Sequence, residues 1–432
     1  MGWFQLAKVD LTTNFCNFDC PNPFLLAASP VARTADMIMR AFEMGWGGAI
    51  SKSLALDQDL PDRSLTPRFS RLSANQYYFA GMGNIDFRID QGVRETIEDW
   101  SRVKRKYPKH FFAVSIKSPG VEKNWRELAS LAESTGADAI ELCLSCPDDD
   151  SGDGNQSLGH NPDKVQEVIG WVQKETSLPI LIKLTPSITN ILPIGLAAQE
   201  AGAVGLSATN TIKSLTGVSL DNLVPEPVIG GRSWFNGLSG AALKPIAMRI
   251  IAELAQEEEL TLQLAGVGGV RDWRDAVEYL LYGATVVQVA TEIMYRGYGI
   301  VEELIDGVEG FLLEKGFSRT KELVGLSLKN MLPTEQLSRK YRVAASFDPD
   351  KCIGCGRCYV SCRDGGYQAI DFDLKERKPV FREEDCHGCG LCTLVCPVQN
   401  CIVMKETKTP FPSGENVKGG ENHALRSCGY CG

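Results

Sequence analysis

Residues 179–210 read PILIKLTPSITNILPIGLAAQEAGAVGLSATN, and this stretch contains the unit from which we predict the fold. Two short apolar runs, Pro179–Leu184 and Val204–Asn210, have the length and side chains of buried strands. Between them, Pro193–Ala201 has the apolar spacing of a helix. A buried strand, a helix and a second buried strand make up the repeating unit of a parallel sheet.

The same alternation extends over residues 20–315. Six further runs have the character of buried strands: Phe24–Ser29, Gly47–Ser53, Phe111–Lys117, Asp138–Ser145, Leu262–Gly268 and Val286–Thr291. Helical patterns lie among them, at Ala35–Met44, Asn124–Ser134, Asp163–Thr176 and Ala242–Leu254. Buried strands that alternate with helices over about 300 residues predict an α/β fold, a (β/α)8 TIM barrel. A doubly wound sheet usually has fewer strands and a phosphate loop after the first.

The residues after the barrel have a different character. Val301–Lys315 and Ser318–Leu332 have helical spacing, whereas Pro333–Ala345 does not. From residue 346 the chain is rich in Cys and Gly with short strands, and its end has no periodicity. We therefore expect a barrel that carries the catalytic site over residues 1–315, a helical linker over 316–345, a small α+β ferredoxin-like domain over 346–406 and a C-terminal tail over 407–432.

Composition argues against several classes of partner. The chain has 45 basic and 54 acidic residues and a net charge of −9, whereas binding to nucleic acid requires a basic surface. No apolar run approaches the roughly 20 residues that a membrane-spanning helix needs. The first eight residues, MGWFQLAK, lack the basic and apolar segments of a signal peptide. We therefore expect a cytoplasmic protein with neither a nucleic-acid nor a membrane partner.

The cysteines indicate iron–sulfur clusters. Nine of the 15 fall between Cys352 and Cys401, where residues 352–362 have the spacing Cx₂Cx₂Cx₃C and residues 386–396 repeat it. A pair of zinc sites is the alternative, but zinc ribbons rarely use a third cysteine at this spacing. In two-cluster ferredoxins the fourth cysteine of each motif ligates the other cluster. We therefore predict two [4Fe–4S] clusters, one held by Cys352, Cys355, Cys358 and Cys396, the other by Cys362, Cys386, Cys389 and Cys392.

Three other cysteines at the end of the chain have no place in these ligand sets. We interpret Cys401 as a buried small apolar residue. Cys428 and Cys431 form a CxxC, for which redox or metal chemistry is an alternative to a tail without such a role.

Polar residues at the carboxyl ends of the barrel strands are candidates for the active site, because (β/α)8 barrels place their chemistry there. Lys52 and Lys183 follow or end two strands, and two inward lysines would offset the electron-rich pyrimidine edge of a reduced flavin. The alternative is that both are surface residues at the barrel mouth. Glycines and backbone amides after the last two strands have the character of a phosphate cradle: Gly268, Gly269, Ala290 and Thr291. No strand is followed by a GxGxxG dinucleotide fingerprint.

Several motifs occur in an order that is specific to one family. They are residues 22–29 (NPFLLAAS), the Lys52 strand, and residues 141–147 (ELCLSCP), 182–186 (IKLTP), 208–211 (ATNT) and 237–241 (GLSGA), followed by the paired cysteine motifs. From about Val9 to Met404 the chain resembles the flavin–iron–sulfur segment of dihydropyrimidine dehydrogenases, and the iron–sulfur and FMN subunit of the bacterial NAD-dependent form most of all. Class 1 dihydroorotate dehydrogenases share the barrel motifs but usually lack an attached ferredoxin.

This resemblance implies a set of cofactors and site residues. FMN would be held by Ala28, Ser29, Lys52, Lys183, Gly240, Gly268, Gly269, Ala290 and Thr291. Hydride would pass between flavin N5 and one carbon of a C=C bond, while Cys146 gives a proton to the adjacent carbon. A small heterocycle such as uracil or thymine would contact Asn84, Cys143, Ser145, Asn210 and Thr211. The resemblance also implies an FAD-containing NAD(P)H oxidoreductase subunit as electron donor, and we expect an oligomer.

One position departs from the family's pattern. The family has Asn three residues before the proton-donating cysteine, and this chain has Cys143. A thiol cannot make the paired hydrogen bonds of an amide. Three hypotheses therefore stay open: reduction of uracil or thymine or the reverse reaction, the same chemistry on another cyclic imide, lactam, enoate or dihydroorotate, and an electron-transfer subunit without catalysis.

Overall fold

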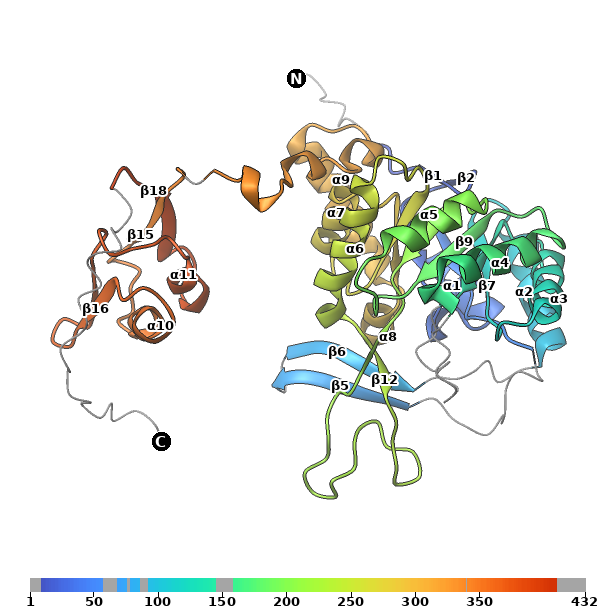
Figure 1. Ribbon diagram of the computed structural model, residues 1–432, viewed down its shortest axis with the longest axis horizontal. Coiled ribbons are helices and arrows are strands. Elements are labelled where there is room, and N and C mark those ends of the chain that lie inside the picture. Colours follow the sequence, from blue (N-terminus) through green and yellow to red (C-terminus); the bar gives the residue numbers. More distant parts are fainter. Residues whose placement is uncertain are drawn as a thin grey trace, which may run out of the picture. The chain divides into compact units, whose positions relative to one another are not determined.

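The computed structural model describes residues 9–56, 68–75, 78–85, 92–144, 158–338 and 340–409. The chain divides into two compact units, Met1–Met331 and Leu332–Gly432. The first contains the barrel and the second contains the paired cysteine motifs (Figure 1). Among the helices of the described ranges, none has both the length and the apolar character needed to cross a bilayer.

Eight parallel strands close a barrel in the first unit. In chain order they are β3 (Phe24–Leu26), β4 (Gly48–Ile50), β7 (Phe111–Ile116), β8 (Ala139–Cys143), β9 (Ile180–Leu184), β10 (Gly205–Ala208), β13 (Gln263–Val267) and β14 (Val286–Val289). Each lies within one of the predicted runs, and β14 returns to pair with β3. The prediction of a TIM barrel is confirmed.

Helices cover the outside of the barrel (Figure 1). Thr34, Asn161 and Asp272 each begin a helix by accepting hydrogen bonds from backbone amides of its first turn. Each long helix buries an apolar face, so Trp100 and Trp125 are fully buried beneath two of them. The helices are α1 (Ala35–Glu43), α2 (Val93–Lys106), α3 (Glu122–Ser134), α4 (Pro162–Gln173), α5 (Leu192–Glu200), α6 (Lys244–Gln256), α7 (Trp273–Leu281), α8 (Thr291–Arg296) and α9 (Ile300–Lys315).

A hairpin closes the amino-terminal end of the barrel. Its strands are β1 (Thr13–Phe15) and β2 (Phe18–Cys20). Phe15 packs edge-on against Phe111, the first residue of β7, with ring centroids 5.6 Å apart. This apolar plug fills the amino-terminal end of the barrel, whereas a ligand cleft opens at the opposite end, where the strands end.

A four-stranded antiparallel sheet lies beyond the other end of the barrel (Figure 1). Its strands, in the order β11-β12-β6-β5, are β11 (Ile212–Ser214), β12 (Asn236–Ser239), β6 (Tyr78–Ile85) and β5 (Arg68–Asn75). The sequence analysis did not identify this sheet, because residues 68–75, RFSRLSAN, lack a regular apolar alternation. Its pairing brings residues from two distant parts of the chain to the barrel mouth.

The helix predicted over Ser318–Leu332 is wrong. This segment contains only two short 3₁₀ turns, η5 (Thr320–Leu323) and η6 (Leu328–Asn330). Gly325 has a φ of +74°, and its amide donates a 2.9 Å hydrogen bond to the carbonyl oxygen of Leu280. The segment therefore bonds to the end of α7 instead of forming a helix of its own. The expected linker residues further along contain another 3₁₀ turn, η7 (Thr334–Gln336), and the start of a strand at Val343.

The second unit contains two pairs of antiparallel strands. Strand β15 (Val343–Phe347) pairs with β18 (Ile402–Glu406), and β16 (Ile370–Asp373) pairs with β17 (Lys378–Phe381), both antiparallel. Helices α10 (Arg357–Gly365) and α11 (Leu391–Val395) each begin inside a cysteine motif. This arrangement bears out the small α+β ferredoxin-like domain.

Glycines shape both cysteine loops in the same way. Gly354 and Gly356 in the first loop have φ of +66° and +72°, and Gly388 and Gly390 in the second both have +74°. A Cβ at Gly388 would lie 2.4 Å from the carbonyl oxygen of Val343. Glycine is required there because side chains rarely adopt this conformation and no space exists for one.

Candidate active site and cluster sites

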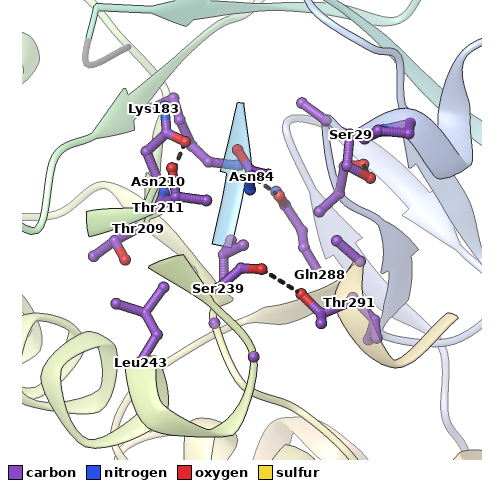
Figure 2. A pocket seen from close by; sticks show the side chains of 18 of the residues that line it. Ser29, Asn84, Lys183, Thr209, Asn210, Thr211, Ser239, Leu243, Gln288 and Thr291 are labelled. Carbon is purple, nitrogen blue, oxygen red and sulfur yellow. Dashed lines mark hydrogen bonds between the residues drawn. The ribbon is translucent and has the colours of Figure 1, made fainter. Parts of the chain in front are cut away.

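A cleft opens at the carboxyl ends of the barrel strands (Figure 2). Counted with the solvent at its mouth, it encloses about 1130 Å³. The predicted barrel residues that line it are Ala28, Ser29, Lys52, Asn84, Cys143, Lys183, Asn210, Thr211, Gly240, Gly268, Gly269, Ala290 and Thr291. Ser145 and Cys146 lie outside the described residues. The structure thus gathers the described candidates in one place, while their individual roles stay predictions.

A glycine turn after β13 forms one end of the cleft. Gly268 and Gly269 have φ of +135° and +69°, and a Cβ at Gly269 would lie 2.8 Å from the carbonyl oxygen of Gly240. Tyr279 Oη donates a 2.7 Å hydrogen bond to the carbonyl oxygen of Gly268. Burial raises the pKa of Tyr279, which keeps its hydroxyl a donor at neutral pH. The turn presents backbone without side chains, as the approach of a phosphate requires.

Charged side chains also hold the same turn in place. Asp275 Oδ2 accepts a 2.8 Å hydrogen bond from the backbone amide of Arg271, and the carboxylate also pairs with Lys244. Burial acts to raise the pKa of Asp275, but hydrogen bonds from Lys244 and the Arg271 amide hold it below its usual value. Asp275 is therefore ionised at neutral pH and ties α7 to the turn.

The last predicted strand ends earlier than expected. Thr291 was expected at the carboxyl end of the eighth strand, but it is the first residue of α8, because the backbone leaves the extended conformation at Ala290. Both residues still line the cleft. Thr291 Oγ1 donates a 2.9 Å hydrogen bond to Ser239 Oγ of β12, so the two segments meet at the cleft wall (Figure 2).

Amide and hydroxyl groups gather at another part of the cleft. Asn210 follows β10, and its Nδ2 lies 3.6 Å from Cys143 Sγ at the end of β8. Asn210 Oδ1 accepts a 2.8 Å hydrogen bond from the Thr211 amide. Asn84 of β6 pairs in register with Gly237 of β12, and a Cβ at Gly237 would lie 2.4 Å from Thr211 Oγ1 and 3.1 Å from Asn84 Oδ1. Donors and acceptors from three segments therefore meet, as recognition of a planar polar ring requires.

Polar side chains also line the cleft where it extends into the barrel interior. Lys183 Nζ lies 3.7 Å from Glu141 Oε2 and 3.4 Å from Gln288 Oε1. Gln288 Nε2 donates a 3.0 Å hydrogen bond to Ser207 Oγ. Glu141 and Gln288 both line the cleft, and the sequence analysis assigned a role to neither. The available signal was a lone charged or amide residue at an inward position of an apolar strand, as in AIELC and VVQV.

Two cavities in the second unit divide the cysteines into two sets. The first is lined by Cys352, Cys355, Cys358 and Cys396, and also by Cys401. The second is lined by Cys362, Cys386, Cys389 and Cys392. Each cavity thus draws three cysteines from one motif and the fourth from the other. This is the spatial arrangement that two crossed [4Fe–4S] ligand sets need.

Two of the buried cysteines need a nearby positive charge to ionise at neutral pH. Burial, together with the neighbouring thiols, raises the pKa of Cys392 to about 12, and burial raises the pKa of Cys358. Iron supplies that charge, since a metal binds the thiolate form. Cys401 is buried and its Sγ lies 3.6 Å from the carbonyl oxygen of Asp348. Its interpretation as a non-ligand stays a prediction.

The two units match two known families. Residues 10–312 match the dihydroorotate dehydrogenase family. The chain belongs to the dihydroorotate dehydrogenase family. Residues 345–404 match the 4Fe-4S dicluster domain, which is an addition to the family's barrel in this chain.

The matches to three relatives of this family member differ in extent. It is 39% identical over 407 residues to the NAD-dependent dihydropyrimidine dehydrogenase subunit PreA of Escherichia coli K12, covering 94% of this chain and 97% of the relative. It is 31% identical over 348 residues to the chloroplastic dihydropyrimidine dehydrogenase (NADP(+)) of Arabidopsis thaliana, covering 78% and 82%. It is 35% identical over 322 residues to the catalytic subunit of dihydroorotate dehydrogenase B of Pyrococcus abyssi, covering 74% and 99%.

The cofactors of this family member are FMN and iron–sulfur clusters. The cleft fits FMN on its own geometry, because a glycine turn without room for a Cβ lies at one end and the buried Lys183 lies in its floor. A phosphate would bind at Gly268 and Gly269, and the ring would lie beside the two lysines. The cysteine-lined cavities fit the two clusters.

Proposed function

We propose that the protein is the FMN and iron–sulfur subunit of a dihydropyrimidine dehydrogenase. It would reduce the C5=C6 double bond of uracil or thymine to the 5,6-dihydropyrimidine, or catalyse the reverse reaction. Electrons would pass from a NAD(P)H-oxidising, FAD-containing partner subunit through the two clusters to the barrel.

One observation carries this proposal: the barrel and the dicluster domain are present together in one chain. The match to PreA extends over 94% of this chain and 97% of that protein. The match to the dihydroorotate dehydrogenase B subunit covers 99% of that relative with only 322 residues, which is close to the length of the barrel unit alone. The combination therefore favours a dihydropyrimidine dehydrogenase subunit like PreA over the shorter relatives.

The residues of the cleft would have separate tasks. FMN, when bound, supplies hydride exchange with one carbon of the double bond. Asn84, Asn210 and Thr211 would hydrogen-bond the alternating N–H and C=O groups of an imide ring. Cys146 would give a proton to the other carbon, a task that suits a thiol because its ordinary pKa of about 8.5 is nearer neutrality than that of a hydroxyl. The apolar plug at the amino-terminal end of the barrel keeps water from entering the cleft from that end.

A second substrate class is favoured by Cys143. Its Sγ lies 3.6 Å from Asn210 Nδ2, so a thiol stands beside the amide that would bind the substrate ring. A ring that makes hydrogen bonds to one amide side chain fewer than uracil does would suit this site. Another cyclic imide, a lactam or an enoate is therefore the alternative substrate, with the same cofactors and the same proton donor.

A panel of unsaturated rings tests the proposal. Chain reduced with dithionite under anaerobic conditions would be mixed in turn with uracil, thymine, orotate, an unsaturated lactam and a cyclic enoate. The proposal requires turnover of uracil or thymine well above that of orotate. Turnover of the lactam or enoate alone would support the second class, and turnover of none of the rings would favour an electron-transfer subunit.

A further inference from the structure

Glu141 is an acidic residue in the interior of an otherwise uncharged part of strand β8. It is fully buried, and it lines the floor of the cleft. Neither of its carboxylate oxygens accepts a hydrogen bond from any other residue that the structure describes. Its nearest opposite charge is Lys183 Nζ, 3.7 Å from Oε2.

Burial without hydrogen bonds makes this carboxylate unusual. A buried ion pair rarely adds to stability, because removing two charges from water costs more than their attraction returns unless further hydrogen bonds satisfy both groups. Ser115, Ser207 and Gln288 show that this part of the barrel interior accepts neutral polar side chains. Stability therefore gives no reason for a glutamate at this position, whereas a function toward the site does.

The strand register explains what Glu141 can reach. Cys143 of β8 lies beside Lys183 of β9, and Lys183 lies beside Ser207 of β10. Glu141 lies two residues before Cys143 on the same face of its strand, so it lines the cleft one layer deeper in the barrel than Cys143 does. Its carboxylate lies beside the Lys183 ammonium group, in a dry environment where opposite charges interact strongly.

We propose that Glu141 is a positioning residue that holds the Lys183 ammonium group at the cleft floor and offsets its charge, and thereby sets the reduction potential of the bound flavin. This rests on FMN lying beside Lys183, as the proposed function requires. Reduction adds negative charge to the ring, which a nearby cation favours and a nearby anion opposes. Lys183 would raise the potential, and Glu141 would keep that rise small.

Four variants of the full chain separate this role from a purely structural one. Glu141→Gln removes the negative charge with almost no change of shape, Lys183→Met removes the cation, and the double variant removes both. Glu167→Gln is the matched control, since Glu167 is ion-paired with Lys164 at 2.6 Å on the exposed surface of α4. Flavin content and the flavin midpoint potential would be measured anaerobically without substrate, with the clusters followed separately by EPR.

The expected shifts have definite signs. Glu141→Gln should raise the flavin potential by at least a tenfold change in the reduction equilibrium, about 30 mV for a two-electron couple. Lys183→Met should lower it, and Glu167→Gln should leave it unchanged. Because Glu141 acts through Lys183, its substitution should have little effect in the Lys183→Met background.

Other outcomes would overturn the inference. An unchanged or lowered potential in Glu141→Gln with full flavin content would mean that the carboxylate has no tuning role. A shift of the same size in the Lys183→Met background would mean that Glu141 acts on the flavin directly. If Glu141→Gln does not fold, Glu141→Asp can replace it, because the shorter side chain withdraws the carboxylate from Lys183. Glu141→Asp should raise the flavin potential by a smaller amount. An unchanged potential in Glu141→Asp would overturn the inference as well. All these readings are made without a pyrimidine, so failure to reduce uracil would contradict only the proposed function.

Discussion

Tyr279 Oη donates a 2.7 Å hydrogen bond to the carbonyl oxygen of Gly268. Tyr279 is fully buried, and a Cβ at Gly266 would lie 2.4 Å from its ring, so the ring fits closely against β13. The hydroxyl therefore fixes the peptide plane that leads into the glycine turn. The orientation of the amides at the cleft depends on a side chain that does not itself line the cleft.

Tyr279→Phe should weaken FMN binding without unfolding the barrel. A lost buried hydrogen bond costs about 1 kcal/mol, so the dissociation constant of FMN should rise about fivefold. Fluorescence titration of the flavin-free chain measures this. Tyr282→Phe, one turn further along and outside the cleft, is the control and should bind FMN like the native chain. Equal losses in both variants would mean that Tyr279 only supports the helix.

Iron content tests the cysteine assignment. The two ligand sets predict about eight iron atoms and eight acid-labile sulfides per chain. Cys355→Ala should lose one cluster, close to half of the iron, while FMN stays bound in the other unit. Cys401→Ala removes a cysteine from the same cavity and should keep the full complement. Full iron in Cys355→Ala together with loss in Cys401→Ala would reverse the assignment, and zinc without sulfide in anaerobic protein would exclude the clusters.

Electron supply should require a partner subunit. The chain has no GxGxxG fingerprint after a strand, so NADH and NADPH should reduce its flavin only slowly. Stopped-flow absorbance of the isolated chain, with dithionite as the positive control, measures this rate. Rapid bleaching of the flavin by either nicotinamide without a partner would contradict the expectation.

Cys146 and Cys143 should affect different steps of the reaction. Cys146→Ala should keep flavin, clusters and most of the substrate affinity, and lose roughly 10² to 10⁴ in kcat, the usual contribution of a positioned proton donor. Cys146→Ser should retain a little activity with its optimum at higher pH, because a hydroxyl is the weaker acid. Steady-state kinetics over a range of pH checks both variants.

Cys143→Asn tests specificity in the same assay. It restores the amide that the family has at this position, beside Asn210, and should lower KM for uracil if pyrimidines bind the native protein poorly. If Cys143→Asn lost activity on every ring while Cys146→Ala kept nearly native activity, Cys143 would be the proton donor and Cys146 the specificity residue.

The barrel and the cysteine sites could be predicted because their signals are local. Runs such as Pro179–Leu184 are apolar apart from Lys183, and the spacing of each cysteine motif is set within eleven residues. The sheet that positions Asn84 could not be predicted, because its strands are partly polar and their pairing joins residues 68–85 to residues 212–239. The resemblance to a family supplied Asn84, and pattern alone did not.

Two other differences have equally physical causes. Ser318–Leu332 has helical spacing, but Gly325 adopts a positive φ and its amide bonds to Leu280 of α7, so tertiary contacts override the local preference. Glu141 was read as part of a strand and of a motif, yet its partner Lys183 becomes visible only when β8 and β9 are placed side by side. Charge pairs inside a barrel depend on how neighbouring strands are aligned, and the sequence of a single strand does not show that alignment.

We propose that this chain transfers two electrons from its flavin to the C5=C6 bond of a pyrimidine. The most direct test of this proposal is a single turnover in which chain reduced with dithionite, freed of excess reductant, is mixed with uracil under anaerobic conditions. Flavin absorbance and the product would be followed together. We expect reoxidation of the flavin with formation of 5,6-dihydrouracil, and neither should occur in Cys146→Ala. A flavin that stays reduced with uracil and thymine but is reoxidised by orotate would contradict it.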